Sequence, residues 1–236
     1  MREIERDALL YVLAVSAGSA DGWSFSGLGH AFVANMTGNT VLLGLGVFQT
    51  NGNLLHPLLS LCCYAVGVTL ASLLTRRDSQ GVVWSKAVSR TLLLEGLLIG
   101  AAAAGWALIR HGWGAGSAGR DFLSLDLLLG MVALGIGLQS GAMLQLKIPG
   151  VVTTYITGTW TTLIRGGARF VAQKERETPA ERIAFEERLL MQAGVLAAYF
   201  LSAVLTGWLF QHVPSAVGAL PAGTVLFAAV YGIARG

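Results

Sequence analysis

The chain has 236 residues, of which 54% are hydrophobic and only 12% are charged, about half the charged fraction of an average soluble domain. Residues 22–75 and 189–234 contain no Asp, Glu, Lys or Arg. A water-soluble domain needs a charged surface, and segments this apolar do not form disordered tails. The composition therefore argues against a soluble enzyme, a nucleic-acid-binding protein or a secreted disulfide scaffold. It indicates an all-α, polytopic membrane helix bundle.

Apolar runs recur along the whole chain. Those of about 20 residues, the length that crosses a bilayer, predict six spans, at 8–28, 54–75, 88–109, 122–146, 189–211 and 214–234. Two shorter runs, 31–48 and 149–166, are rich in Gly, Thr and Asn. The stretch 169–190 is strongly charged and alternates acids with bases, which predicts a solvated cytoplasmic helix with Pro179 near its start.

The distribution of Lys and Arg decides between six and eight crossings. With six spans and a cytoplasmic N-terminus, all Lys and Arg except Arg110 and Arg120 lie on the cytoplasmic side, as the positive-inside rule requires. If the two shorter runs also crossed, the cations of residues 76–90 would lie outside. We therefore predict six spans, both termini in the cytoplasm, and two re-entrant or half-helix segments. Such backbone is stable at membrane depth only where protein buries it or a cavity adjoins it.

Three short motifs recur in the same order in the two halves. They are GSADG at 18–22 with GLQSG at 137–141, TGNTVLL at 37–43 with TGTWTTL at 157–163, and YAVGVTLASLL at 64–74 with YFLSAVLTGWL at 199–209. Each half contains three predicted spans, an odd number, so the halves have opposite orientations in the membrane. The pattern predicts an inverted 3+3 repeat. We treat residues 1–236 as a single transmembrane domain, with repeats at about 8–109 and 122–234.

The two shorter runs carry the candidate substrate-binding residues. Asn39 and Thr40 favour the first position of a helix and directly precede an apolar run, so we predict that a half-helix starts at one of them. Two half-helix ends that met near the membrane midplane would form a polar site for a small solute or ion. The alternative is that these are capped turns that only pack the bundle. The candidate residues are Thr37, Gly38, Asn39, Thr40, Gln139, Ser140, Thr157, Gly158 and Thr159.

Two carboxylates lie within apolar runs and are candidates for proton or ion coupling. They are Asp21 and Glu95. A carboxylate at the centre of a span costs about 2.5–3.5 kcal/mol, so it needs a partner, a cavity or a proton. The alternative for Asp21 is a capping role, in which it accepts backbone N–H bonds from the first hairpin. For Glu95 the alternative is a structural polar contact with a neighbouring span.

The motifs together resemble a known family. SADGWSF, FVANMTGNTVLLG and GLQSGAM…TTYITGTWTTL are similar to segments of the YoaK-like family of bacterial integral membrane proteins, a domain of unknown function. The resemblance covers most of the chain, and MTGNTVLLG is its most specific piece. It implies six membrane spans and a bacterial inner (cytoplasmic) membrane location, and it implies no substrate. Ser140 departs from the family pattern, because many members carry Asn at this position.

These observations favour a transporter or exporter of a small solute, with Asp21 as the group that couples transport to protons. A passive channel for a small solute, and a non-transporting scaffold or accessory subunit, are the alternatives. Because the chain has no metal-binding, nucleophile or phosphate-loop motif, we expect no enzyme activity, catalytic residue, metal or cofactor. The expected partners are membrane lipid and the solute or ion, and no nucleic acid. The patterns Gly67-x-x-x-Ala71 and Ala203-x-x-x-Gly207 are typical of close helix contacts, within one chain or in a homo-oligomer.

Overall fold

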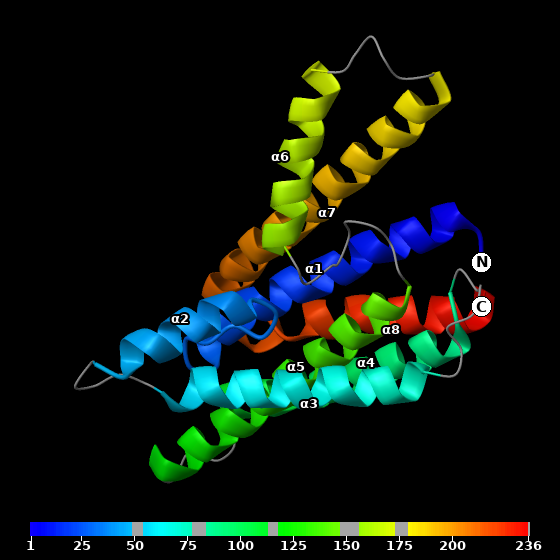
Figure 1. The fold of residues 1–236 in the computed structure, drawn as a ribbon. Helices are drawn as coiled ribbons and strands as arrows, with labels where there is room; N and C mark the ends of the chain where they lie inside the picture. The colour runs from blue at the N-terminus through cyan, green and yellow to red at the C-terminus, as the bar shows by residue number, and fades with distance from the viewer. Residues whose placement is uncertain (49–53, 77–83, 113–117, 147–155, 173–178, 236) are drawn as a thin grey trace.

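The fold is a bundle of α-helices, seen in a computed structural model that describes residues 1–48, 54–76, 84–112, 118–146, 156–172 and 179–235 (Figure 1). These residues form eight α-helices and one short 3₁₀ helix and contain no strand. The elements are α1 (Glu3–Gly27), α2 (Met36–Gly46), α3 (Leu55–Thr75), α4 (Lys86–Arg110), α5 (Ala118–Gln145), α6 (Ile156–Ala172), α7 (Pro179–His212), η1 (Pro214–Ala216) and α8 (Ala219–Arg235).

Five helical segments are long and apolar enough to cross a membrane. They are Leu55–Thr75, Lys86–Arg110, Leu125–Gln145, Phe185–His212 and Pro214–Arg235, and each matches one of the predicted spans. The remaining predicted span, 8–28, is the helix α1, which has 25 residues. Ser, Gly and Asp interrupt the apolar sequence of α1, and most of its second half is buried among other helices.

The long helices pack in pairs through glycine. Gly18 of α1 faces the carbonyl oxygen of Tyr199 in α7, and Gly137 of α5 faces the carbonyl oxygen of Tyr64 in α3; at either glycine a Cβ atom would lie only 2.3 Å from that oxygen. Gly67 packs in the same way against α5, so the Gly67-x-x-x-Ala71 pattern serves a contact within the chain. Small residues at these positions let the helix backbones touch, which stabilises helix pairs in lipid.

The contacts between helices also define their directions. α1, α4 and α7 run one way through the bundle, and α3, α5 and α8 run the other way. At one end Gly27 of α1 packs on Trp106 of α4. At the other end the first and last described residues of the chain meet, and N and C lie side by side in Figure 1.

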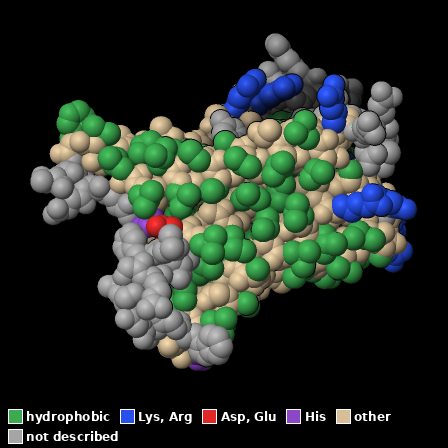
Figure 2. Space-filling view, turned by 90° about the horizontal axis from the view of Figure 1, so that it is seen from below, with side chains coloured by type: hydrophobic (Ala, Val, Ile, Leu, Met, Phe, Trp, Pro, Cys, Tyr) green, Lys and Arg blue, Asp and Glu red, His purple; other side chains and the backbone are tan. Residues whose placement is uncertain are grey.

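The exterior of the bundle is apolar. Large hydrophobic side chains such as Leu73, Phe200 and Leu201 are more than 60% exposed. Figure 2 shows hydrophobic side chains spread over much of the visible face, with Lys and Arg along its upper edge and at its right end. A soluble domain seldom exposes so large a continuous apolar surface, whereas lipid covers such a surface in a membrane protein.

The two shorter runs form short helices that start inside the bundle. α2 begins at Met36, beside Asp21, about 9 Å inside the end of α1 at 1.5 Å per residue. It then runs outward to the start of α3. α6 begins at Ile156 and packs along α7, where Gly166 contacts Leu189. α6 and the first part of α7 project away from the other helices (Figure 1). Residues 149–155 of the second run lie outside the described residues.

Two of the predicted boundaries change. The prediction that the first half-helix starts at Asn39 or Thr40 is wrong, because the helix starts at Met36 and its N-cap is Asn35, whose side chain accepts a hydrogen bond from the Gly38 amide at 3.0 Å. The charged stretch 169–190 does not form a separate helix. Its described part belongs to the end of α6 and to the first third of α7, which begins at Pro179 as expected; residues 173–178 lie outside the description.

Candidate functional site

Asp21 fixes the loop that leads into α2. Its Oδ1 atom accepts hydrogen bonds from the backbone amides of Val33, Ala34 and Asn35 at 2.7, 2.6 and 3.4 Å. Its Oδ2 atom accepts a hydrogen bond from the hydroxyl of Tyr199. The carboxylate is 4% exposed. These are the contacts of the capping alternative: the carboxylate supplies an acceptor to the amides of the loop that leads into α2.

Asn39 fixes the same loop from the α2 side. Its Oδ1 accepts from the Phe32 amide at 2.8 Å, and its Nδ2 donates to the Phe32 carbonyl at 2.6 Å and to the Ser60 hydroxyl at 3.1 Å. The side chain is fully buried. A buried amide that meets both a donor and an acceptor of one residue gives the loop a single conformation. The role of Asn39 in this geometry is to hold the loop.

A third contact holds the beginning of the loop. The Nδ1 atom of His56 lies 2.9 Å from the carbonyl oxygen of Gly29, and its Nε2 atom lies 2.8 Å from a carboxylate oxygen of Asp126. The ring lies directly over Gly29, where a Cβ atom would be 2.2 Å from it. His56 thus connects α3, α5 and the loop.

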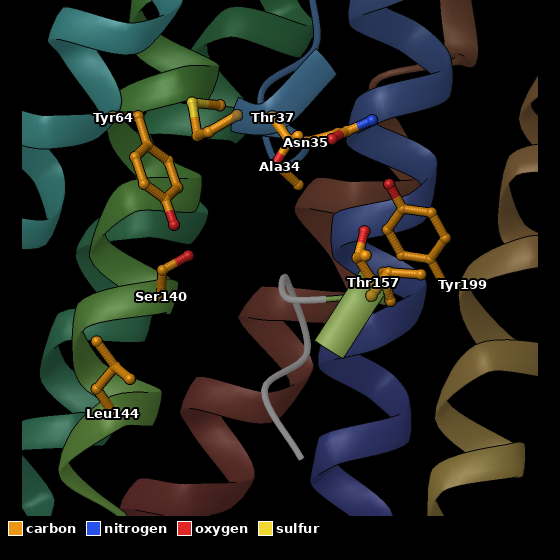
Figure 3. A pocket seen from close by; sticks show the side chains of 10 residues that line it. Ala34, Asn35, Thr37, Tyr64, Ser140, Leu144, Thr157 and Tyr199 are labelled. Carbon is orange, nitrogen blue, oxygen red and sulfur yellow. The ribbon is translucent and has the colours of Figure 1, made fainter. Parts of the chain in front are cut away.

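A pocket of about 500 Å³ lies where α2 and α6 begin (Figure 3). Its volume falls within the range of small-molecule sites, roughly 300–1,000 Å³. α3 and α5 form one wall, α7 forms the other, and the start of α2 closes one end. The lining residues are Ala34, Asn35, Met36, Thr37, Tyr64, Ser140, Leu144, Ile156, Thr157 and Tyr199.

The structure brings three of the predicted substrate-binding residues together in this pocket. Thr37 and Thr157 are the second residues of α2 and α6, and Ser140 lies on the facing side of α5. All three carry hydroxyl groups. The pocket thus brings together the start of α2, the start of α6 and the first motif of the second half, which are separate in the sequence.

The other predicted residues lie outside the pocket lining. Thr40 donates to the Met36 carbonyl within its own helix at 2.9 Å. Gln139 is buried on another face of α5 and donates to the carbonyl of Leu13 at 3.1 Å. Thr159 is buried. Gly38 and Asn39 lie in the first turn of α2, and Gly158 lies in the first turn of α6. None of the three lines the pocket.

The two predicted coupling carboxylates have different surroundings. Asp21 lies directly behind Tyr199, whose ring lines the pocket. Glu95 is fully buried in α4, and neither of its oxygens has a hydrogen-bond partner among the described residues. Its neighbours on α5 include Gly135, where a Cβ atom would lie 3.4 Å from the Glu95 Cγ. Only Asp21 is in contact with a residue that lines the pocket.

Several pocket residues escaped the sequence analysis. Tyr64 and Tyr199 are the first residues of the repeated segments 64–74 and 199–209, and this shared position was the available signal. Asn35 precedes an apolar helix as an N-cap residue does, so its role could also have been predicted from the sequence. Nothing in the sequence marks Met36, Leu144 or Ile156, because apolar residues in an apolar chain carry no distinguishing pattern.

Comparison with known proteins places the chain among membrane proteins. The family model described as "Protein of unknown function (DUF1275)" matches residues 9–231. The UPF0700 transmembrane protein YoaK of Bacillus subtilis (strain 168) is 29% identical over 202 residues, which cover 85% of this chain and 82% of that protein. No solved structure matches. The similarity agrees with the five apolar helices of spanning length.

Proposed function

The chain belongs to the DUF1275 family, and we propose that it transports a small solute across the bacterial cytoplasmic membrane. The observation that carries this proposal is the pocket of about 500 Å³ at which two short helices from the two halves of the chain begin. In many secondary transporters, the ends of short half-helices near the membrane midplane form the substrate-binding site.

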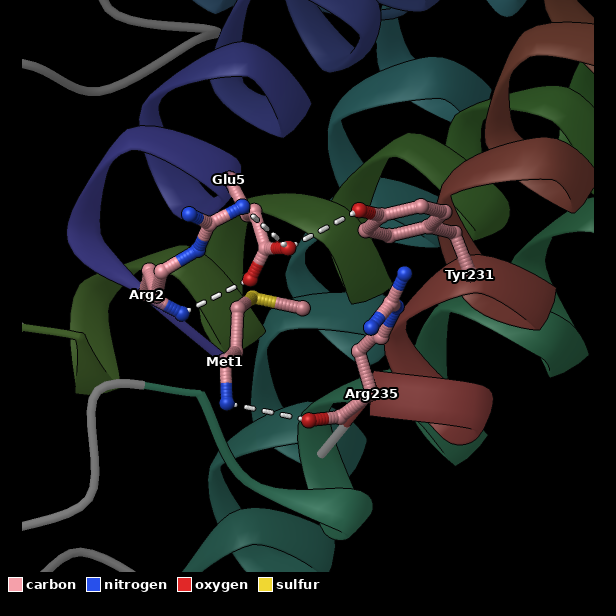
Figure 4. A network of polar contacts seen from close by, with 5 residues as sticks. All are labelled: Met1, Arg2, Glu5, Tyr231 and Arg235. Carbon is pink, nitrogen blue, oxygen red and sulfur yellow. Dashed lines mark hydrogen bonds and ion pairs between the residues drawn. The ribbon is translucent and has the colours of Figure 1, made fainter.

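Six crossings, with α1 as the first, account for the course of the chain. The amino group of Met1 donates to the carbonyl of Arg235 at 3.0 Å, and the hydroxyl of Tyr231 donates to Glu5 at 3.3 Å (Figure 4). Both ends of the chain therefore lie on one side of the bundle, which an even number of crossings requires. α2 and α6 are then re-entrant half-helices.

The cations support a cytoplasmic location of this end. The end of α3 carries Arg76, and the first turns of α4 carry Lys86 and Arg90. All three side chains are exposed and lie at the end of the bundle where the termini meet. Exposed cations of this kind remain on the cytoplasmic side of the membrane.

An inverted repeat accounts for the matched helix contacts. The sequence motifs align Gly18 and Tyr199 with Gly137 and Tyr64, and these residues make the same glycine–carbonyl contact in both halves. The next pairs along the same helices also match: Gly22 faces Thr206, and Gly141 faces Ala71. The pairing of α1 with α7 corresponds to that of α5 with α3, and α4 pairs with α8. On this proposal the pocket lies at the interface of the repeats, where transporters bind their substrates.

A pocket-filling substitution tests the transport proposal. We expect Thr37→Trp to abolish solute flux, because Thr37 lines the pocket and an indole ring would occupy much of its volume. The measurement is swelling of proteoliposomes by stopped-flow light scattering with glycerol, urea, glycine and sodium acetate. The matched control is Val41→Trp, one turn further along α2, where the side chain is 57% exposed away from the lining. Equal flux in the two variants, or no flux above that of protein-free liposomes for the unsubstituted protein, would contradict the proposal.

Asp21 is the group we propose to couple transport to protons. Protonation would weaken the hydrogen bonds that Oδ1 accepts from three loop amides, and it would change the hydrogen bond with Tyr199. Protonation would therefore affect both the loop before α2 and the pocket wall. We expect Asp21→Asn to lose uptake driven by a pH gradient and to keep solute binding, because the amide oxygen still accepts from the loop and the Tyr199 hydroxyl can accept from the amide nitrogen. Full pH-driven uptake by this variant would remove Asp21 from the mechanism.

A further inference from the structure

The core of the bundle contains a carboxyl group without a hydrogen bond. Glu95 lies nine residues after the start of α4, about 14 Å along the helix at 1.5 Å per residue, and its side chain is fully buried. Neither of its oxygens has a hydrogen-bond partner in the part of the chain that the structure describes. Asp21, by contrast, accepts hydrogen bonds from three loop amides and from the Tyr199 hydroxyl. The two buried carboxyl groups therefore have opposite surroundings.

The contacts around Glu95 are apolar, at a depth where α4 lies against α5 and α8 (Figure 1). A Cβ atom at Gly135 of α5 would lie 3.4 Å from the Glu95 Cγ atom. Gly96, the next residue of α4, packs on the side chain of Leu226 in α8. Thr91 lies one turn before Glu95, and its hydroxyl donates to a carbonyl oxygen of its own helix. The interface of the three helices thus encloses the carboxyl group, and the described residues offer it no donor.

The other elements that touch α4 keep their titratable side chains away from Glu95. α3 contacts α5 through Gly137, which is about 200° around the helix from Gly135 at 3.6 residues per turn. The titratable residues of α3 are His56, Cys62, Cys63 and Tyr64, and they therefore lie on the far side of α5. η1 carries no titratable side chain, and α1 meets α4 at Trp106, eleven residues beyond Glu95.

The titratable side chains of α5 and α8 are distant along their helices. Asp126 lies nine residues before Gly135, or about 14 Å at 1.5 Å per residue. Tyr231 lies five residues after Leu226, and its hydroxyl donates to Glu5 at 3.3 Å. The titratable residues of these two helices whose side chains are described are Asp126, Tyr231 and Arg235. Glu95 thus has no charged neighbour of either sign within the described part of the interface.

We infer that Glu95 is a proton-binding site that is occupied at neutral pH while α4 packs against α5 and α8, and that releases its proton to water when these helices separate. An unpartnered carboxylate is far more costly in apolar surroundings than a neutral carboxyl group, so the buried group keeps its proton. A hard metal cation does not take the place of the proton, because it requires several oxygen ligands and the described residues form no group of three acidic, His or Cys side chains that could hold one. Proton binding at Glu95 is then controlled by helix packing, which goes beyond the proposed role of Asp21 at the pocket.

Infrared spectroscopy of the purified full-length protein tests whether Glu95 carries a proton. A protonated carboxyl group and an ionised carboxylate absorb in separate regions of the spectrum. We expect the difference between the unsubstituted protein and Glu95→Gln at neutral pH to contain the C=O band of one protonated carboxyl group. Glu187→Gln is the matched control, because Glu187 is exposed on α7, and its difference spectrum should contain carboxylate bands instead. Carboxylate bands in the Glu95→Gln difference would overturn the inference.

The pH dependence of SDS-induced unfolding tests the link to helix packing. In an unfolded chain Glu is ionised above about pH 5, so unfolding should release the proton of Glu95 to water. Stability should therefore fall as the pH rises from about 5.5 to 7.5, with the unfolding equilibrium constant increasing by up to about 10-fold more per pH unit than in Glu95→Gln. Glu187→Gln should keep the pH dependence of the unsubstituted protein. The same pH dependence in Glu95→Gln as in the unsubstituted protein would also overturn the inference. Neither measurement involves a solute, so the transport proposal can fail while this one holds.

Discussion

Replacement of Asp21 by Ala is expected to lower the free energy of unfolding by about 4 kcal/mol, since a buried donor that loses its partner costs about 1–3 kcal/mol. The substitution leaves the amides of Val33 and Ala34 and the hydroxyl of Tyr199 without their acceptor in the interior of the bundle. Water does not reach this site easily, because Asp21 is only 4% exposed. The loop before α2 should lose its position first.

The measurement is thermal or SDS-induced unfolding of the purified protein, with Asp21→Asn as the control. Asparagine keeps an oxygen for the loop amides, so we expect this variant to lose less than half as much stability. Equal stabilities of Asp21→Ala and the unsubstituted protein would mean that the loop is held by Asn39 and His56 alone.

The second large effect is expected at the glycines between paired helices. We expect Gly18→Ala and Gly137→Ala each to cost about 2–3 kcal/mol, in the range of an overpacked core. In either variant the new methyl group would lie 2.3 Å from a backbone carbonyl oxygen of the partner helix, and a backbone atom can move only if the whole helix moves. Since one substitution separates α1 from α7 and the other separates α5 from α3, both should also reduce solute flux.

Gly207 and Gly100 provide the matched controls. No atom lies within 4 Å of a Cβ at either position, and alanine favours a helix over glycine by about 1 kcal/mol. Gly207→Ala and Gly100→Ala should therefore unfold at or above the temperature of the unsubstituted protein. The packing argument would be wrong if all four alanine variants unfolded at the same temperature.

The sequence predicts the helices well because each spanning helix depends on the apolar residues of its own segment. Apolar runs of spanning length correspond to α3, α4, α5, α7 and α8, with ends within a few residues except where α7 continues into the charged stretch. Polar, glycine-bearing starts mark α2 and α6 as shorter helices. The start of α2 was misplaced because several residues within six positions, Asn35, Asn39 and Thr40 among them, can cap a helix. The choice of Asn35 depends on the distant carboxylate of Asp21, which holds the preceding loop.

Only some of the pocket residues could be predicted from the sequence, because the others are set by contacts with distant residues. Thr37, Ser140 and Thr157 stand out as hydroxyl residues in repeated motifs. Asn39 and Gln139 look equally suitable in the sequence, but their side chains turn to the backbone of Phe32 and Leu13. The direction in which a buried amide points depends on which backbone groups lie beside it, and here those belong to the loop before α2 and to α1.

Composition and the spacing of apolar runs were sufficient to determine that this is an all-helical membrane protein. Each residue that faces lipid must be apolar, and this requirement can be read directly from the sequence. The repeated motifs predict which segments are equivalent. Only the tertiary structure decided that the tyrosines of the two repeated segments, rather than Asn39, line the pocket and that Asp21 holds the loop behind it. Those outcomes depend on contacts between residues of different helices, such as Gly18 with Tyr199 and Gly137 with Tyr64, where glycine–carbonyl packing sets which helix faces meet.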